Sequence, residues 1–418
     1  MLTPDYLAHC TDYLLGLYDE LDRAIVRDIA RRIVKTGSVS ETARWQIDRA
    51  QHSGMLLSDV TEQVARVNAV SEEEVRQLFE DAGIVGMEND AKPLVLAGQE
   101  VDRTLSPAMK EVLNAAIEKT NWDVQNLTMT TGSTAQNAYM EAINKAYMKV
   151  QSGAFSYNQA VRDAVREAAK DGNWVYYLAT GHRSRLDVAI RRAVRTGINQ
   201  TAGVLTEMYS EDMGAEYYET TAHAGARPSH AEWQGRVFKI IGADSNHPNF
   251  RDATGYGTGP GLCGWNCRHS FYPFWPGISQ PAYTKGILNW YDSPRYEYDG
   301  NRYTEYEISQ MMRAHERSIR ETKRVLAGEQ AAMDATDDAK LRAAMQADFD
   351  TAAAKLKKQE AEYKDLCQKT KHKPDSERTA VVATLDRRGK IVSFSRSTAQ
   401  RARRSYERQI KAEAEKAG

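Results

Sequence analysis

The chain has 418 residues and a mass of 47.0 kDa, with 56 Lys and Arg against 57 Asp and Glu. A formal net charge of -1 excludes a wholly basic, histone-like protein, and 41% hydrophobic residues exclude a disordered chain. At roughly 100–200 residues per domain, this length predicts several domains. Four cysteines are too few for a disulfide framework, which favours a reducing compartment. We expect no membrane span and no signal peptide, because long apolar runs are missing, including in residues 1–20.

Residues 1–205 have the periodicity of helices, and we expect a helical region there. In the first long helix, apolar side chains recur at three- and four-residue steps and line one face: Leu14, Leu17, Leu21, Ile25, Ile29 and Ile33. Gly37 is expected to end this helix.

Local capping signals predict where further helices begin. Ser106 before Pro107 predicts an N-cap followed by a proline in the first turn. Capping-box spacing, in which two side chains satisfy each other's backbone N–H groups, occurs at Ser38 with Glu41, Ser71 with Glu74, and Thr304 with Glu307.

A basic stretch follows residue 184. One apolar stripe predicts a helix there: Leu186, Ile190, Val194 and Ile198. Four arginines lie mostly off this stripe: Arg185, Arg191, Arg192 and Arg195. A solvated helix face is the favoured interpretation, and contact with an acidic partner or with phosphates is the alternative.

Residues 206–300 differ from their surroundings by clustered Gly, Pro and aromatic residues, which predicts a small α+β motif domain. Its first strand is expected over residues 216–221. Residues 301–370 return to helix and predict an amphipathic hairpin, broken near Gly328. The fold class expected is therefore mainly α with a small α+β domain.

Residues 371–418 form a basic tail, with 13 Lys and Arg against 6 Asp and Glu, a net charge of +7. Residues 379–385 and 390–395 are expected to pair as a hairpin. The terminal helix that follows carries Arg401, Arg403, Arg404, Arg408 and Lys411. Clustered cations of this kind favour nucleic-acid contact about as strongly as a solvated surface.

The histidines and cysteines of residues 223–269 allow three interpretations. Zinc could be bound by His223, His230, Cys267 and His269, although their spacing matches no standard zinc motif. Cys267 could instead be a nucleophile with a histidine base, but no acid partner stands out. We favour the third interpretation, in which the polar side chains hydrogen-bond an irregular backbone.

Three segments resemble the signature of the tailed-phage minor capsid protein 2 family, which is related to the Mu F-like head-morphogenesis proteins. They are His223-Ala-Gly-Ala-Arg-Pro-Ser-His-Ala-Glu-Trp-Gln-Gly235, Gly259-Pro-Gly-Leu-Cys-Gly-Trp-Asn-Cys-Arg-His269 and Pro273-Phe-Trp-Pro-Gly277. The resemblance marks as family-motif residues, with a structural or interaction role, His223, Gly225, Ala226, Arg227, Pro228, His230, Trp233, Gln234, Gly235, Asn266, Cys267, Arg268 and His269.

The resemblance implies a virion component, made in the host cytoplasm and built into the phage head near the portal in few copies. Its implied partners are the portal protein and other capsid or scaffold proteins, through the helical region 1–205, with non-specific contact to packaged DNA. It implies no enzyme and no cofactor, and it weakens the zinc interpretation because Cys263 is not a required part of the family pattern. The competing hypothesis is a metal- or thiol-dependent hydrolase built on the His and Cys cluster.

Overall fold

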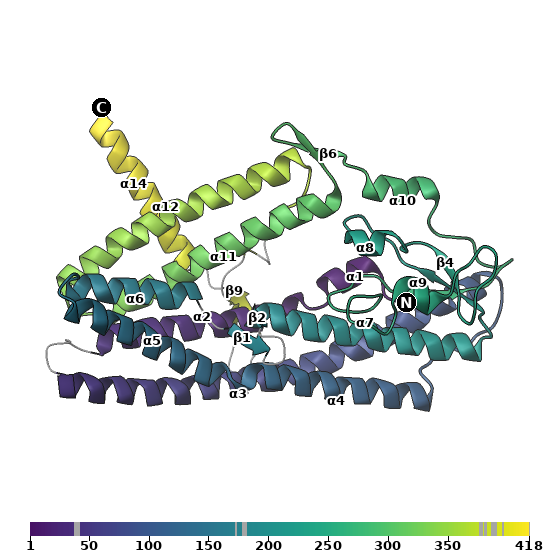
Figure 1. The fold of residues 1–418 in the computed structure, drawn as a ribbon, viewed down its shortest axis with the longest axis horizontal. Coiled ribbons are helices and arrows are strands. Elements are labelled where there is room, and N and C mark those ends of the chain that lie inside the picture. Colours follow the sequence, from purple (N-terminus) through teal and green to yellow (C-terminus); the bar gives the residue numbers. More distant parts are fainter. Residues whose placement is uncertain are drawn as a thin grey trace. The chain divides into compact units, whose positions relative to one another are not determined.

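The computed structural model describes residues 1–36, 42–171, 174–177, 182–375, 379, 383–385, 391–394 and 397–417 (Figure 1). The chain divides into two compact units, each assembled from three separated segments. Unit 1 comprises Met1–Leu14, Ser71–Gln125 and Ile190–Met311, and unit 2 comprises Leu15–Val70, Asn126–Ala189 and Met312–Gly418. The divisions expected at residues 205, 300 and 370 mark changes of composition along the chain, and as domain boundaries they stay predictions.

Helices dominate the fold and the strands are short (Figure 1), which confirms the expected fold class. The helices are α1 (Pro4–His9), α2 (Asp12–Lys35), α3 (Thr42–Leu96), α4 (Pro107–Met129), α5 (Thr131–Gln151), α6 (Tyr157–Asp171), α7 (Leu186–Asp212), α8 (Pro228–Ala231), α9 (Phe250–Thr254), α10 (Lys285–Asp292), α11 (Glu305–Ala335), α12 (Ala339–Lys369) and α14 (Ser397–Ala417). The strands are β1 (Trp174–Tyr177), β2 (His182–Arg185), β3 (Tyr217–Thr220), β4 (Val237–Lys239), β5 (Phe271–Phe274), β6 (Tyr296–Tyr298), β7 (Asn301–Tyr303), β8 (Ala383–Leu385) and β9 (Ile391–Phe394).

Several local predictions are confirmed. The six apolar residues expected on the first long helix lie on α2 or at its start, and none is more than 2% exposed. The Ser106 hydroxyl accepts a hydrogen bond from the Met109 N–H at 3.2 Å, directly before α4. At the start of α11, the Thr304 N–H donates to the Glu307 carboxylate at 2.8 Å and the Glu307 N–H donates to the Thr304 hydroxyl at 3.3 Å. That exchange is a complete capping box.

Two predicted helix boundaries are wrong. Ser71 lies inside α3 and is only 1% exposed, because the buried stripe runs through it from Val67 to Val75 without interruption. Gly328 lies inside α11 rather than breaking it. A Cβ at Gly328 would lie 2.9 Å from the Cβ of Ala169, so the glycine permits close helix packing. Gly37 and the capping box of Ser38 with Glu41 lie outside the described residues.

In unit 2, the hairpin of α11 and α12 packs through buried polar contacts. The Thr322 hydroxyl of α11 donates to the Gln359 side chain of α12 at 2.8 Å. Arg162 of α6 holds the Asp348 carboxylate of α12 with two hydrogen bonds of 2.6 and 2.7 Å. Because fork-shaped pairs of this kind fix direction as well as distance, they orient the hairpin on α6. β8 and β9 pair antiparallel as expected, while the turn between them lies outside the described residues.

In unit 1, a three-stranded antiparallel sheet has the order β4-β3-β5, with the predicted strand β3 at its centre. Its core is a compact aromatic and cysteine cluster: Tyr218, Trp233, Phe238, Phe250, Leu262, Cys263, Cys267 and Phe271. The expected stripe of α7 is also buried, at 0–1% exposure. Among the described residues, no helix combines the length and apolarity that crossing a membrane requires.

Candidate metal centre and basic surfaces

The two motif stretches, 223–235 and 259–269, meet beside the sheet of unit 1. His230 lies on α8, a single helical turn between β3 and β4. Cys267 and His269 precede β5, which pairs with β3 from Tyr217↔Phe274 to Thr220↔Phe271. Because β3 is the central strand, its pairing with β5 brings together residues that lie more than 30 positions apart.

Three donor atoms converge at this place. The Cys267 sulfur lies 3.7 Å from Nδ1 of His230 and 3.6 Å from Nδ1 of His269. The two Nδ1 atoms are 3.4 Å apart. Each of the three residues is only 2% exposed. A cysteine and two histidines are natural zinc ligands, and their donor atoms form one tight group.

The opposite nitrogen of each ring has its own partner. Nε2 of His230 donates to the carbonyl oxygen of Pro260 at 2.8 Å. Nε2 of His269 donates to Oε1 of Gln234 at 3.1 Å. That oxygen also accepts the backbone N–H of His223 at 3.1 Å, which fixes the orientation of the amide. Both rings therefore present the unprotonated Nδ1 to Cys267.

His223, the fourth zinc candidate of the sequence analysis, does not join this group. Its ring stacks on His269 with centroids 4.4 Å apart. Its Nδ1 atom lies 2.8 Å from the Ala224 carbonyl oxygen and 3.3 Å from the guanidinium of Arg268. The expected set of four is thus corrected to three donors, because among the described residues the converging ligand atoms belong to His230, Cys267 and His269.

Burial keeps the group uncharged. It lowers the pKa of His230 and, together with the neighbouring histidines, places the pKa of His269 well below its usual range. Burial, reinforced by Arg268, lowers the pKa of His223 to about 3. Burial also raises the pKa of the Cys267 thiol to about 11. A buried neutral thiol is a poor nucleophile, so the geometry does not favour the thiol-dependent hydrolase.

Asn199 of α7 anchors the loop that carries two of the donors, a role that is not predicted from the sequence. Its Nδ2 donates to the carbonyl oxygens of Cys267 at 3.2 Å and His269 at 2.9 Å. The side chain is fully buried. Its one sequence signal is its place directly after Ile198, at the edge of the apolar stripe of α7.

Glycines let the loop between α9 and β5 fold back on itself. A Cβ on Gly261 would lie 2.0 Å from the carbonyl oxygen of Gly255, and one on Gly264 would lie 2.1 Å from that of Gly259. Both gaps are far shorter than any real carbon–oxygen contact, so backbone passes over backbone here. Asn266 then takes a φ of 54°, a left-handed conformation that asparagine tolerates better than most residues.

The remaining motif residues lie in the same two stretches, around the three donor residues. Arg227 is the N-cap of α8, before Pro228, and its guanidinium donates to the Trp265 carbonyl oxygen at 2.9 Å. The buried Trp233 ring lies against the rings of His230 and His269. The other positions are the buried Ala226 and two left-handed glycines, Gly225 with φ 78° and Gly235 with φ 64°.

The arginines around α7 are mostly engaged within the protein. Arg195 is 5% exposed and donates to the Ala8 carbonyl oxygen at 2.8 Å, so its role as an outward contact is corrected. Arg185 donates to the Lys170 carbonyl oxygen at 2.6 Å. Arg191 and Arg192 are half-buried, and both interact within the chain.

The basic residues of α14 are better placed for a partner. This helix packs on α12 through buried Ser405, whose hydroxyl donates to Asp350, and Arg401 lies 3.4 Å from Asp334. Its outer surface carries Arg403, Arg404, Arg408 and Lys411, all exposed. Arg404, Arg408 and Lys411 follow at steps of four and three residues and form one stripe, here called the basic stripe.

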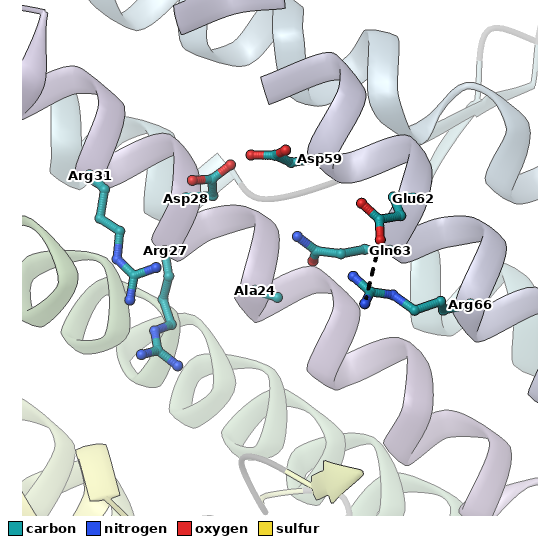
Figure 2. Close-up of a pocket in the computed structure, with 8 residues that line it drawn as sticks. All are labelled: Ala24, Arg27, Asp28, Arg31, Asp59, Glu62, Gln63 and Arg66. Atoms are coloured by element: carbon teal, nitrogen blue, oxygen red, sulfur yellow. Dashed lines mark ion pairs between the residues drawn. The ribbon is translucent and has the colours of Figure 1, made fainter. Parts of the chain in front are cut away.

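A separate hollow of about 410 Å³ lies between α2 and α3 in unit 2 (Figure 2). Its lining includes Asp28, Asp59, and the pair of Glu62 with Arg66 at 3.7 Å. The guanidinium of Arg32 binds Asp28 at 3.0 Å and Asp59 at 2.5 Å. All lining residues except Ala24 are charged or polar, so the hollow lacks the apolar lining typical of a small-molecule site.

Comparison with known protein sequences identifies the family of this chain. The sequence profile of the family described as phage minor capsid protein 2 matches residues 2–368. A curated relative, described as a structural protein of Lactococcus phage LL-H, is 23% identical over 297 residues, which cover 68% of this chain and 76% of the relative. No solved structure matches the chain. Since the profile covers most of its length, the protein belongs to the phage minor capsid protein 2 family.

Proposed function

We propose that this protein is a portal-associated, non-catalytic component of the phage head that acts in head morphogenesis. It is made in the host cytoplasm, is incorporated in few copies, and has a motif region of the Mu F-like type. The observation that carries the proposal is the family match over residues 2–368, together with a relative described as structural. The burial of His230, Cys267 and His269, each only 2% exposed, supports a role without turnover because a substrate has no access to them.

One described surface suits docking on another capsid protein. None of the eight residues of α10 is buried, although the helix carries large apolar side chains. Ile287 is 39% exposed and Trp290 is 54% exposed. Aromatic side chains of this kind supply much of the energy of protein interfaces. We propose that α10 contacts the portal protein, in place of the helical region 1–205 expected from the resemblance.

Quantitative mass spectrometry of purified virions tests the proposal. We expect peptides of this chain at or below the copy number of the portal and far below that of the major capsid protein. Chemical crosslinking of the same virions is expected to join Lys285 of α10 to portal peptides. Absence of the chain from virions would contradict the proposal, as would crosslinks from α10 to the major capsid protein alone.

A paired substitution tests the docking surface. The double variant Ile287→Asp/Trp290→Asp is expected to lower incorporation into heads by at least about tenfold, because one or two hot-spot side chains commonly contribute more than 1.4 kcal/mol each. The control is Ile241→Asp, since Ile241 is 84% exposed in the same unit but lies outside α10. Equal incorporation of both variants would remove α10 from the portal interface.

We further propose that the basic stripe of α14 contacts packaged DNA through its phosphates, without reading base sequence. Replacing Arg404, Arg408 and Lys411 with Ala is expected to make the slope of log Kobs against log salt shallower by about 2–3 units. Binding of a duplex at increasing salt, measured by fluorescence anisotropy, gives this slope. The control removes three exposed lysines of α12, namely Lys355, Lys358 and Lys364. An equal change in both triple variants would assign the effect to net charge alone.

A further inference from the structure

We propose that His230, Cys267 and His269 bind one Zn²⁺ ion. The ion links α8 to the loop that directly precedes β5. This site goes beyond the structural role of the family match and is independent of any contact with the portal. The sequence alone favours hydrogen-bonded histidines at these positions. The geometry of the three donor atoms reverses that preference.

Without a cation, the group has more lone pairs than hydrogens. Nε2 of His230 faces the carbonyl oxygen of Pro260, which carries no hydrogen, so that nitrogen must hold the proton. The same logic applies to Nε2 of His269, because Oε1 of Gln234 is already fixed as an acceptor by a backbone N–H. Two Nδ1 lone pairs therefore face each other across 3.4 Å. Cys267 has one thiol hydrogen and can satisfy one of them.

A cation resolves this conflict, and the spacing fits zinc. With Zn–S near 2.3 Å and Zn–N near 2.05 Å, tetrahedral angles place sulfur about 3.6 Å from each nitrogen and the two nitrogens about 3.3 Å apart. The observed separations are 3.6 and 3.7 Å from sulfur to nitrogen and 3.4 Å between the nitrogens. The donor atoms thus already occupy three corners of a zinc-sized tetrahedron.

The outer contacts are also those of a metal site. Ligating histidines usually donate their second ring nitrogen to a carbonyl or an amide oxygen, which fixes the ring. Pro260 and Gln234 supply these acceptors here. The backbone N–H of His269 donates to the Cys267 sulfur at 3.3 Å, a contact that stabilises a thiolate. One thiolate with two imidazoles favours zinc over magnesium or calcium, which prefer oxygen ligands.

Burial assigns the ion a structural role. All three ligands are 2% exposed, and Trp233 packs against both histidine rings, so a substrate has no route to the metal. Binding exchanges the thiol hydrogen of Cys267 for Zn²⁺ and releases one proton to solvent. The three protein ligands leave one tetrahedral position for a small ligand such as water.

Elemental analysis of the purified full-length chain tests the site. We expect about one zinc per chain in the wild type and less than about a tenth of that in His230→Ala and Cys267→Ala, because two remaining protein ligands hold zinc poorly. The matched controls are His223→Ala and Cys263→Ala, which change a neighbouring histidine and cysteine outside the donor group. Both controls are expected to retain the metal. Loss of zinc in the controls but not in the ligand variants would overturn the assignment.

A measurement on the unaltered protein covers the case in which the ligand variants fail to fold. Cobalt exchanged into the wild type is expected to show thiolate charge-transfer absorption and the intense visible bands of tetrahedral geometry. X-ray absorption of the zinc form is expected to show one sulfur and three nitrogen or oxygen neighbours. A wild-type protein without stoichiometric metal that also takes up no added zinc or cobalt would refute the proposal, and two sulfur neighbours would refute the three-donor set.

Discussion

Gly261→Ala is expected to destabilise unit 1 by about 3 kcal/mol or more, which is large against the usual stability of a domain. The new methyl group would lie 2.0 Å from the carbonyl oxygen of Gly255 and 2.4 Å from its carbon. Backbone atoms cannot swing aside as a side chain does, so the loop before Cys267 has to open. Urea denaturation followed by circular dichroism measures the loss.

The control for this prediction is Gly286→Ala in the same unit. Gly286 lies within α10, and a Cβ there would meet only the Thr284 hydroxyl at 3.8 Å. Alanine is the better helix former, so stability is expected to stay unchanged or rise by up to about 1 kcal/mol. If Gly261→Ala also left the free energy of unfolding unchanged or raised it, the close approach of residue 261 to the Gly255 backbone would be contradicted.

Asn199→Asp is expected to cost at least about 3 kcal/mol at neutral pH, although the side chain keeps its shape. The amide donates to the carbonyl oxygens of Cys267 and His269 from a fully buried position. A carboxylate would turn a donor into a charged acceptor facing two further acceptors. The loop should then detach from α7, which faster proteolysis between α9 and β5 would report.

Asn114→Asp on the exposed side of α4 is the matched change for that experiment. It makes the same replacement of an amide by a carboxylate and the same change of net charge. Its effect on stability is expected to stay within about 0.5 kcal/mol. Equal effects of the two substitutions would show that Asn199 does not hold the loop.

The helices were largely predictable from the sequence, because their signals lie within a few residues of one another. The apolar face of α2 and the caps at Ser106 and Thr304 depend on local spacing alone. The same short range explains the errors. A serine followed by a glutamate three residues later also occurs inside helices, and only the continuous burial around Ser71 distinguishes it. The place of Gly328 inside a helix could not be predicted, because it depends on packing against Ala169, which lies on another helix.

The candidate site was predictable in residue type but not in arrangement. The sequence indicates His230, Cys267 and His269 as candidate ligands, but it indicates His223 as well, because spacing does not reveal ring orientation. The decisive partner of His230 is the Pro260 carbonyl oxygen, a backbone atom that residue identity cannot indicate. Likewise, burial of Arg195 depends on the chain around Ala8, 187 positions away.

The order of the strands has a consequence for synthesis on the ribosome. β3 is translated more than 50 residues before β5, and the Ser270 hydroxyl bonds the carbonyl oxygen of Leu2 from 268 positions away. Contacts of such long range form late, since closing long loops costs chain entropy first. Until β5 emerges and pairs, the cysteines and histidines of the nascent motif stay open to oxidants and stray metals. Reducing conditions during synthesis therefore matter most for this part of the chain.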